Sequence, residues 1–492
     1  MAADGSRAPS PAETRRIATD PGRLDLVGAP EGFDALVMAD IVKARGGLSV
    51  FVARDGSRLS AFADAFRFFA PGTQVLRFPS WDCLPYDRVG PSPGVAAERM
   101  TTLARLAQGF DPKTPILLVT TVPAAMQRTP PREAVKGATW SAKVGNVVEI
   151  AELERYFAVN GYQRASTVSE RGEFAIRGGV IDVYPPAAEE PVRLDLFGDI
   201  LESIRGFDRE TQRSTRQLTA IDLPPVSEAL LDADAISRFR TGYLSSFGAP
   251  GGDPLYDTVS EGGRRAGMEH WLPLFYERME TLFDYLPAGA LVGVDHLAAE
   301  ARDERLAMIQ DAFEARDQAD RKAHYRAIAP DLLYLTVDEW DGRLDHFASR
   351  QFEPLSREGG EQIVDMGAKL GRSFSAERAQ DSVNLFEATA DHAKRLAAAG
   401  KRVLFASWSE GSSERLSAML ADHGMRGVSL APYWQAAKAA DPVVDVHHQV
   451  AGGQRRGFGQ KVGRAASALG PRQAVPQDVG FGDDRQVAGL EA

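Results

Sequence analysis

Four short apolar runs alternate with amphipathic stretches over residues 23–138, and this order restricts the possible folds more than any other feature. The runs are LDLVGA, LSVFVAR, TQVLRFP and PILLVTTV, and the stretches between them have the length and spacing of helices. Buried parallel strands read as continuous β-branched runs, and the helices that connect them cover the faces of the sheet. The sequence therefore predicts an α/β fold with a parallel sheet.

The length of 492 residues, 44% of them hydrophobic, is enough for three or four domains. Both ends of the chain lack periodic apolar positions: the start is rich in Ala, Ser and Pro, and the last fifty residues are rich in Gly, Arg and Gln. We expect a disordered leader over 1–22, the first part of an α/β domain over 23–138, a small α+β domain over 139–224, the second part of the α/β domain over 225–348, a small α/β domain over 349–440, and a disordered tail over 441–492.

Within the middle regions, ELERYFAVNGY predicts a helix that is followed by three strand-like segments. A long charged helix is expected across HLAAEARDERLAMIQDAFEARDQADRKAHYR, with Leu306, Ile309 and Phe313 as its apolar stripe. Further on, DSVNLFEATADHAKRLAAAG, KRVLFAS and SSERLSAMLADHG predict a helix, a strand and a helix.

Composition limits the classes of function. The net charge of −11 argues against electrostatic binding of nucleic acid over the whole surface. A local DNA contact in the tail remains an alternative, through Arg455, Arg456, Lys461 and Arg464. One cysteine excludes internal disulfides and thiolate metal clusters. Since no run of 18 apolar residues and no signal peptide occurs, we expect a cytoplasmic protein without membrane contact.

The first strand-to-helix turn, VGAPEGFDAL, lies where a phosphate-binding loop would lie. Such a loop needs Gly, Lys and Ser/Thr, but counting from Gly28 these positions are Phe33, Asp34 and Ala35, and Asp34 would repel a triphosphate. Asp295 ends a later apolar strand as a metal-holding acid would, yet histidine follows it instead of glutamate. We therefore expect an inactive nucleotide site, no catalytic residue and no metal.

The segment VRLDLFGD raises a different possibility. Alternation places its leucines on the core side and Arg193, Asp195 and Phe197 on the outer side, and Arg177 on the neighbouring strand can join them. Arginine beside an exposed aromatic is typical of protein-interface hot spots. On patterning alone, a hot spot and a stray exposed phenylalanine are equally supported. The mixed charge of the flanking residues, which include Arg171, Glu173 and Arg205, suits a protein partner better than a phosphate backbone.

Three long motifs resemble the N-terminal part of bacterial transcription-repair coupling factors. They are FPSWDCLPYDRVGPSPGVAAERMTTL, RGEFAIRGGVIDVYPPAAEEPVRLDLFGDILESIRGFDRETQRS and GMEHWLPLFYERMETLFDYLP. With ASWSEGSSERL, the similarity covers about residues 24–440, and the same region is similar to the repair protein UvrB.

This resemblance implies a degenerate, RecA-type helicase-like domain with an inserted domain that binds UvrA, the damage-sensing ATPase of nucleotide excision repair. The UvrA-contacting Arg, Arg and Phe of the family fall on Arg177, Arg193 and Phe197, with Arg171, Asp195 and Arg205 as possible flanking contacts. Complete family members continue into an RNA-polymerase-interacting domain and an ATP- and Mg-dependent DNA translocase. Neither is visible here, and we expect that a frameshift or truncation near residue 441 removed them.

Three hypotheses follow. The favoured one is a non-catalytic, UvrA-recruiting module of a transcription-repair coupling factor. The second is an ATP-dependent DNA helicase or UvrB-like repair ATPase, against which Phe33, Asp34 and Ala35 argue. The third is a DNA-binding module that acts through the basic tail.

Overall fold

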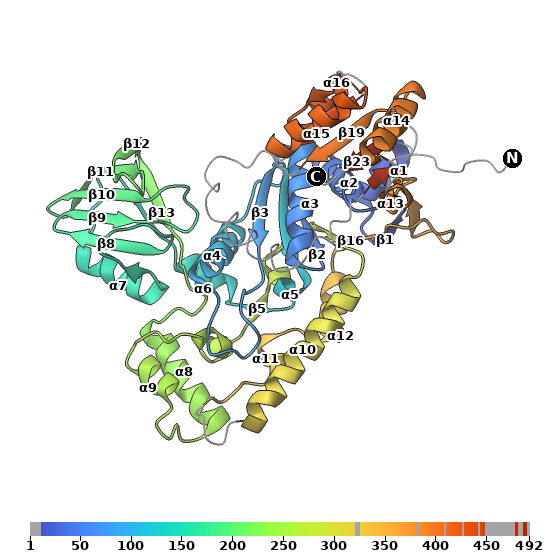
Figure 1. Ribbon diagram of the computed structural model, residues 1–492. Coiled ribbons are helices and arrows are strands. Elements are labelled where there is room, and N and C mark those ends of the chain that lie inside the picture. Colours follow the sequence, from blue (N-terminus) through green and yellow to red (C-terminus); the bar gives the residue numbers. More distant parts are fainter. Residues whose placement is uncertain are drawn as a thin grey trace.

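The computed structural model describes residues 11–319, 325–380, 384–407, 410–425, 428–440, 443–447, 478–480 and 486–489. Its centre is a sheet of seven parallel strands in the order β17-β1-β16-β15-β2-β4-β3 (Figure 1). The strands are β1 (Arg23–Val27), β2 (Leu48–Ala53), β3 (Gln74–Phe78), β4 (Ile116–Thr121), β15 (Leu291–Val294), β16 (Ala348–Phe352) and β17 (Ile363–Asp365). The predicted α/β class is confirmed, and strands from before and after the inserted domain complete one sheet.

Helices cover both faces of this sheet, as the continuous apolar runs predict. Phe51 on β2 stacks on Phe62 of one helical layer with ring centroids 3.5 Å apart, whereas Val50 and Val52 face the opposite layer. The first layer holds α2 (Phe33–Arg45) and α3 (Gly56–Phe69). The second holds α4 (Pro93–Gln108), α5 (Val122–Ala125), α6 (Arg132–Gly137), η2 (Leu282–Tyr285) and α12 (Val337–Leu344).

The expected disordered leader is wrong for helix α1 (Pro11–Thr19), which packs on α2 through the buried Ile17. Two arginines bind the carbonyl groups at the C-terminal end of this helix. Arg45 donates to Ala18 O at 2.8 Å, and the buried Arg350 donates to Ile17 O at 2.6 Å and to Gly22 O at 2.7 Å. Cations at a helix C-terminus satisfy its free carbonyls and its dipole. Because both arginines lie far away in the sequence, the leader alone could not reveal the helix.

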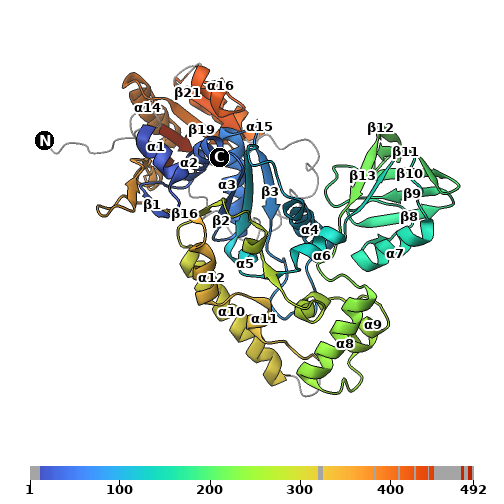
Figure 2. The ribbon, with the colours of Figure 1, turned by 180° about the vertical axis from the view of Figure 1, so that it is seen from behind.

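The inserted domain forms a separate sheet with the order β12-β11-β10-β9-β8-β7, which lies to one side of the central sheet in both views (Figures 1 and 2). Helix α7 (Ile150–Asn160) covers its inner face, where Phe157 stacks on Phe174 at 4.3 Å. Three strand-like segments were predicted, but the short β7 and the polar β12 lack apolar alternation and could not be recognised. The strands are β7 (Gln163–Arg164), β8 (Glu173–Arg177), β9 (Val180–Val183), β10 (Val192–Phe197), β11 (Ile200–Phe207) and β12 (Ser214–Leu218), with β6 (Trp140–Lys143) and β13 (Ala220–Leu223) paired beside them.

A helical lobe with its own aromatic core follows the inserted domain. Its long helix α10 (Ala298–Ala319) buries Ile309 and partly buries Leu306 and Phe313, which confirms the predicted stripe. The lobe also contains α8 (Ala233–Phe247), α9 (Pro254–Ser260), η1 (Met268–Leu274) and α11 (Pro330–Leu333), and β5 (Arg128–Thr129) pairs with β14 (Glu280–Thr281).

The predicted domain boundary between residues 348 and 349 is wrong, because β16 and β17 pair on either side of β1 in the central sheet. The last unit begins after β17, and Trp434 packs it against Phe69 of α3 at 5.6 Å. Its elements are β18 (Lys369–Leu370), α13 (Ser375–Arg378), α14 (Leu385–Ala398), β19 (Val403–Ser407), α15 (Glu410–Asp422), β20 (Ser429–Leu430), α16 (Trp434–Ala439), β21 (Val443–His447), β22 (Asp478–Gly480) and β23 (Gln486–Gly489).

The prediction of an unstructured tail from residue 441 is wrong for β21, β22 and β23, which join the sheet of this last unit. The β-branched run VVDV in β21 pairs in parallel with β19 on one side and with β20 on the other, so strand propensity and these two pairings decide its conformation. The basic residues Arg455, Arg456, Lys461 and Arg464 lie outside the described residues. Across the described ranges, no helix combines the length and apolarity needed to cross a bilayer.

Candidate functional site

The side of the inserted sheet that faces away from α7 carries the predicted partner-binding residues. We call it the outer face and define it by Arg177, Asp182, Arg193, Asp195, Phe197 and Arg205. The leucines of β10 lie on the inner side, where Leu194 is fully buried in the core of the domain. Phe197 is 76% exposed, more than any other large apolar residue in the described part of the chain.

Asp182 on β9 joins the two predicted arginines and was not foreseen. It lies directly opposite Arg193 in the register between β9 and β10. Arg193 donates from Nε to Asp182 Oδ1 at 2.6 Å and from Nη2 to Oδ2 at 2.9 Å, while Arg177 Nη1 lies 3.6 Å from Oδ2. Both guanidinium groups therefore lie on the same face, held by one carboxylate whose side chain is only 3% exposed.

The two arginines differ in their contacts and in the exposure of their side chains. Arg193 lies over the buried ring of Phe207 at 4.9 Å, its pKa is raised mainly by the hydrogen bonds to Asp182, and its side chain is 22% exposed. Arg177 also donates to Ser166 O, but its side chain remains 54% exposed. Arg177 is therefore the more accessible cation. Arg193 is less exposed, and its guanidinium mainly contacts Asp182 and the ring of Phe207.

The predicted flanking residues form a second ion pair on the same face. Arg205 donates from Nε to Asp195 Oδ2 at 3.1 Å, and Ser203 Oγ donates to the same oxygen at 2.6 Å. Although partial burial would raise the pKa of Asp195, these hydrogen bonds hold it below its ordinary value. Arg171 lies at the far end of the domain, where its guanidinium is 6.0 Å from the ring of Tyr184.

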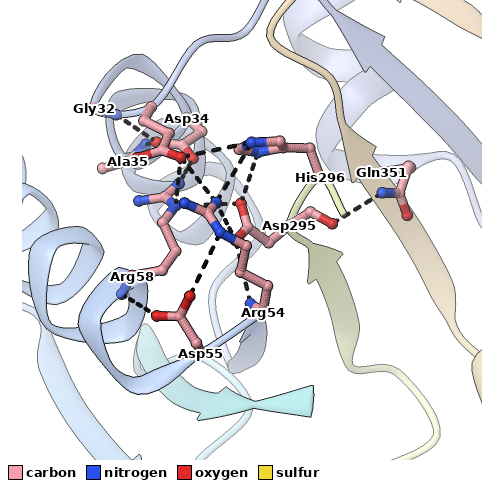
Figure 3. Close-up of polar contacts among 10 residues, drawn as sticks. Gly32, Asp34, Ala35, Arg54, Asp55, Arg58, Asp295, His296 and Gln351 are labelled. Atoms are coloured by element: carbon pink, nitrogen blue, oxygen red, sulfur yellow. Dashed lines mark hydrogen bonds and ion pairs between the residues drawn. The ribbon is translucent and has the colours of Figure 1, made fainter. Parts of the chain in front are cut away.

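The expected nucleotide site lies in the central sheet domain, and a network of ion pairs fills it (Figure 3). Asp34 is buried in the first turn of α2, where its Oδ1 accepts hydrogen bonds from Gly32 N at 2.9 Å and Ala35 N at 2.7 Å. Backbone N–H groups at a helix N-terminus are the groups that hold phosphate in nucleotide sites. In this chain the N–H groups of Gly32 and Ala35 bind the protein's own carboxylate, that of Asp34.

Arg58 and Asp295 extend this network. Arg58 donates to Asp34 and, from Nε, to Asp295 Oδ1 at 3.2 Å, while Arg54 Nη1 donates to the other oxygen of Asp295 at 3.2 Å. Burial raises the pKa of Asp34 to about 6, against the opposing charge of Arg58. The hydrogen bond between His296 Nδ1 and Asp295 Oδ1 at 3.2 Å raises the pKa of His296.

The other predicted residues of this site have packing roles. Gly28 has φ 62°, and a Cβ there would lie 2.6 Å from both Asp365 Oδ1 and Ser356 Oγ, so the close approach to the β17 end of the sheet requires glycine. Phe33 and Ala35 are buried in the core beneath α2. The structure thus brings the five predicted positions into one region.

Comparison with known proteins identifies the inserted domain and its surroundings. Residues 141–228 match the family described as "UvrB interaction domain". The chain is 32% identical over 343 residues to the transcription-repair-coupling factor of Haemophilus influenzae, covering 68% of this chain and 29% of that protein. The corresponding values for the Escherichia coli K12 protein are 30% over 334 residues, with 65% and 27% covered. The Bacillus subtilis protein is 31% identical over 239 residues, with 46% and 20% covered.

The matched region is less than a third of the length of each of these relatives. Within that region, the identity of about 30% extends well beyond the inserted domain into the central sheet domain. The resemblance seen in the motifs is therefore confirmed: this chain contains a UvrB interaction domain and, over more than half of its length, is homologous to part of the transcription-repair coupling factors.

Proposed function

We propose that this chain is a non-catalytic adaptor that recruits UvrA in transcription-coupled nucleotide excision repair, and that UvrA binds the outer face. The observation that carries the proposal is the exposed ring of Phe197 on the same face as Arg177, within the domain that matches the UvrB interaction domain. Interface hot spots combine aromatic and arginine side chains in this way.

The distribution of charge on the outer face also supports a protein partner. The side chains of Asp182 and Asp195 are 3% and 22% exposed, whereas those of Arg177 and Arg205 are 54% and 39% exposed. The cations therefore stand further out than the carboxylates that hold them. A partner with acidic groups beside an apolar depression would complement this arrangement.

The direct test is Phe197→Ala in the full chain, titrated with purified UvrA by isothermal calorimetry. We expect about 30-fold weaker binding, which corresponds to about 2 kcal/mol for a hot-spot aromatic. Leu244→Ala on α8 is the matched control, since Leu244 is also an exposed apolar side chain but lies in the helical lobe. Both variants should retain the circular dichroism spectrum of the parent, and unchanged affinity of the Phe197 variant would contradict the adaptor.

The alternative function, an ATP-dependent helicase or UvrB-like ATPase, requires a nucleotide site. Asp34 and Arg58 support the opposite proposal, that the chain binds neither ATP nor Mg. Asp34 accepts from the N–H groups that a phosphate would need, and Arg58 donates to the same carboxylate. Titration with a fluorescent ATP analogue and Mg²⁺ should show no saturable binding. Saturable binding that Asp295→Ala abolishes would favour the ATPase.

A further inference from the structure

Two exposed aliphatic side chains that belong to no predicted site continue the apolar surface of Phe197. Ile200, at the start of β11, is 50% exposed, and Val147, in the turn before α7, is 71% exposed. We call Phe197, Ile200 and Val147 together the apolar stripe. Val147 lies some fifty residues before the other two, so sequence alternation within β10 could not reveal it.

Strand pairing places these three side chains in one row. Ile200 is the direct cross-strand partner of Phe197 in the β10–β11 hairpin, and an antiparallel bridge pairs Val147 with Ile200. Backbone hydrogen bonds fix the turn against the hairpin, from Val148 N to Asp199 O at 2.7 Å and from Leu201 N to Asn146 O at 2.9 Å. Directly opposed residues have Cβ atoms about 4.5–5.5 Å apart and point to the same face, so the three side chains are contiguous.

The fold gives no reason for this stripe to be apolar. Val147 and Ile200 are mostly in water, and the backbone hydrogen bonds that hold the turn would be made equally by polar β-branched residues. Single exposed apolar residues are ordinary, but contiguous rows of them mark interaction surfaces. The row also starts at Phe197, and so adjoins the charged part of the outer face.

We propose that the apolar stripe is part of the partner-binding surface, and that its occupant is an apolar groove on UvrA. This inference rests on the proposed function and extends it. The stripe supplies the desolvated centre of the contact, and Arg177 supplies the charged rim, where acidic groups of UvrA would meet it. The aliphatic side chains of Ile200 and Val147 can form neither ion pairs nor hydrogen bonds with a nucleic-acid backbone, so their contribution is specific to a protein partner.

The test is the double variant V147T/I200T in the full chain, titrated with purified UvrA beside Phe197→Ala and Arg177→Ala. Threonine keeps the branched shape and the strand preference, so the hairpin and its turn should remain folded. We expect about tenfold weaker binding by V147T/I200T. Leu430→Thr is the matched control, because Leu430 is an exposed aliphatic residue on β20 of the last unit, and it should bind UvrA like the parent.

The possible outcomes separate the two proposals. If Phe197→Ala and Arg177→Ala weaken binding but V147T/I200T does not, the stripe is not part of the surface and the adaptor function stands. If none of the variants weakens binding, the adaptor function fails and the inference fails with it. Sedimentation velocity on the chain alone gives a third outcome: a dimer that V147T/I200T dissociates would show that a second copy covers the stripe, which would also overturn the inference.

Discussion

Replacing Arg193 by alanine tests whether Asp182 organises the outer face. The substitution removes two charge-assisted hydrogen bonds, at 2.6 and 2.9 Å, from a carboxylate whose side chain is 3% exposed. Of its ion pairs with described residues, Asp182 would keep only the weaker one with Arg177, at 3.6 Å. Arg193 is therefore expected to affect the stability of the inserted sheet as well as partner binding.

The magnitude follows from the burial of the pair. Breaking a fully buried ion pair by removing one partner costs about 3–5 kcal/mol. Arg193 is itself 22% exposed, and the long side chain of Arg177 can move towards Asp182, so both effects reduce the cost. We expect Arg193→Ala to lower the free energy of local unfolding of β9 and β10 by about 2 kcal/mol.

Hydrogen exchange measured by mass spectrometry suits this prediction, because a chain of several domains does not unfold in a single two-state step. A loss of about 2 kcal/mol corresponds to roughly 30-fold faster amide exchange in peptides that cover β9 and β10. Arg205→Ala is the matched control: it breaks the more exposed pair with Asp195 on the neighbouring strand and should cost less than about 1 kcal/mol.

The double variant D182N/R193A tests whether the unpaired charge of Asp182 destabilises the sheet. Since it removes the buried charge together with its partner, it should exchange more slowly than Arg193→Ala alone. Two results would refute the role given to Asp182: exchange in Arg193→Ala equal to that of the parent, or a double variant no better protected than the single one.

Two further predictions concern the central domain. Because the hydrogen bond to Asp295 raises the folded-state pKa of His296, its protonated form stabilises the fold fully below the unfolded pKa, and this stabilisation is lost as the pH rises through the folded pKa. The difference in apparent thermal midpoint between the parent and His296→Gln should thus shrink as the pH rises from below about 6.5, and a constant difference would be inconsistent with it. Glu228→Ala leaves the buried Arg99 of α4 without its carboxylate at 2.6 Å, and should lower the free energy of local unfolding of α4, measured by hydrogen exchange, by about 3–5 kcal/mol; a loss below about 1 kcal/mol would argue against this.

The sequence predicts those parts of the fold whose signals are local. The strand β2 reads LSVFVA because helices cover it on both faces, and α10 shows its stripe because that helix buries one side. Helix α1 and strand β12 were missed for the opposite reason. The first depends on Arg45 and Arg350 from distant segments, and the second is a polar edge strand whose pairing with β11 defines it.

In the candidate sites too, local sequence signals predict some residues, whereas the roles of others depend on contacts between distant segments. Alternation in β10 predicts the outward direction of Phe197, and the missing lysine predicts an altered nucleotide site. The role of Asp182 depends on the register between β9 and β10, and that of Val147 on a bridge to a hairpin fifty residues later. Likewise, the sequence predicts that Asp34 opposes phosphate, but its hydrogen bonds with Gly32 N and Ala35 N appear only in three dimensions.

The position of β1 in the central sheet bears on the synthesis of this protein by the ribosome. Within the described residues, β1 pairs only with β16 and β17, and its flanking Gly22 accepts a hydrogen bond from Arg350, which lies 328 residues later. At usual elongation rates, those residues take roughly 15–60 s to translate. Throughout that interval the nascent strand has neither of its neighbours, so the unpaired N–H and C=O groups along its two edges must be shielded by chaperones or by the early helices until the later segment emerges.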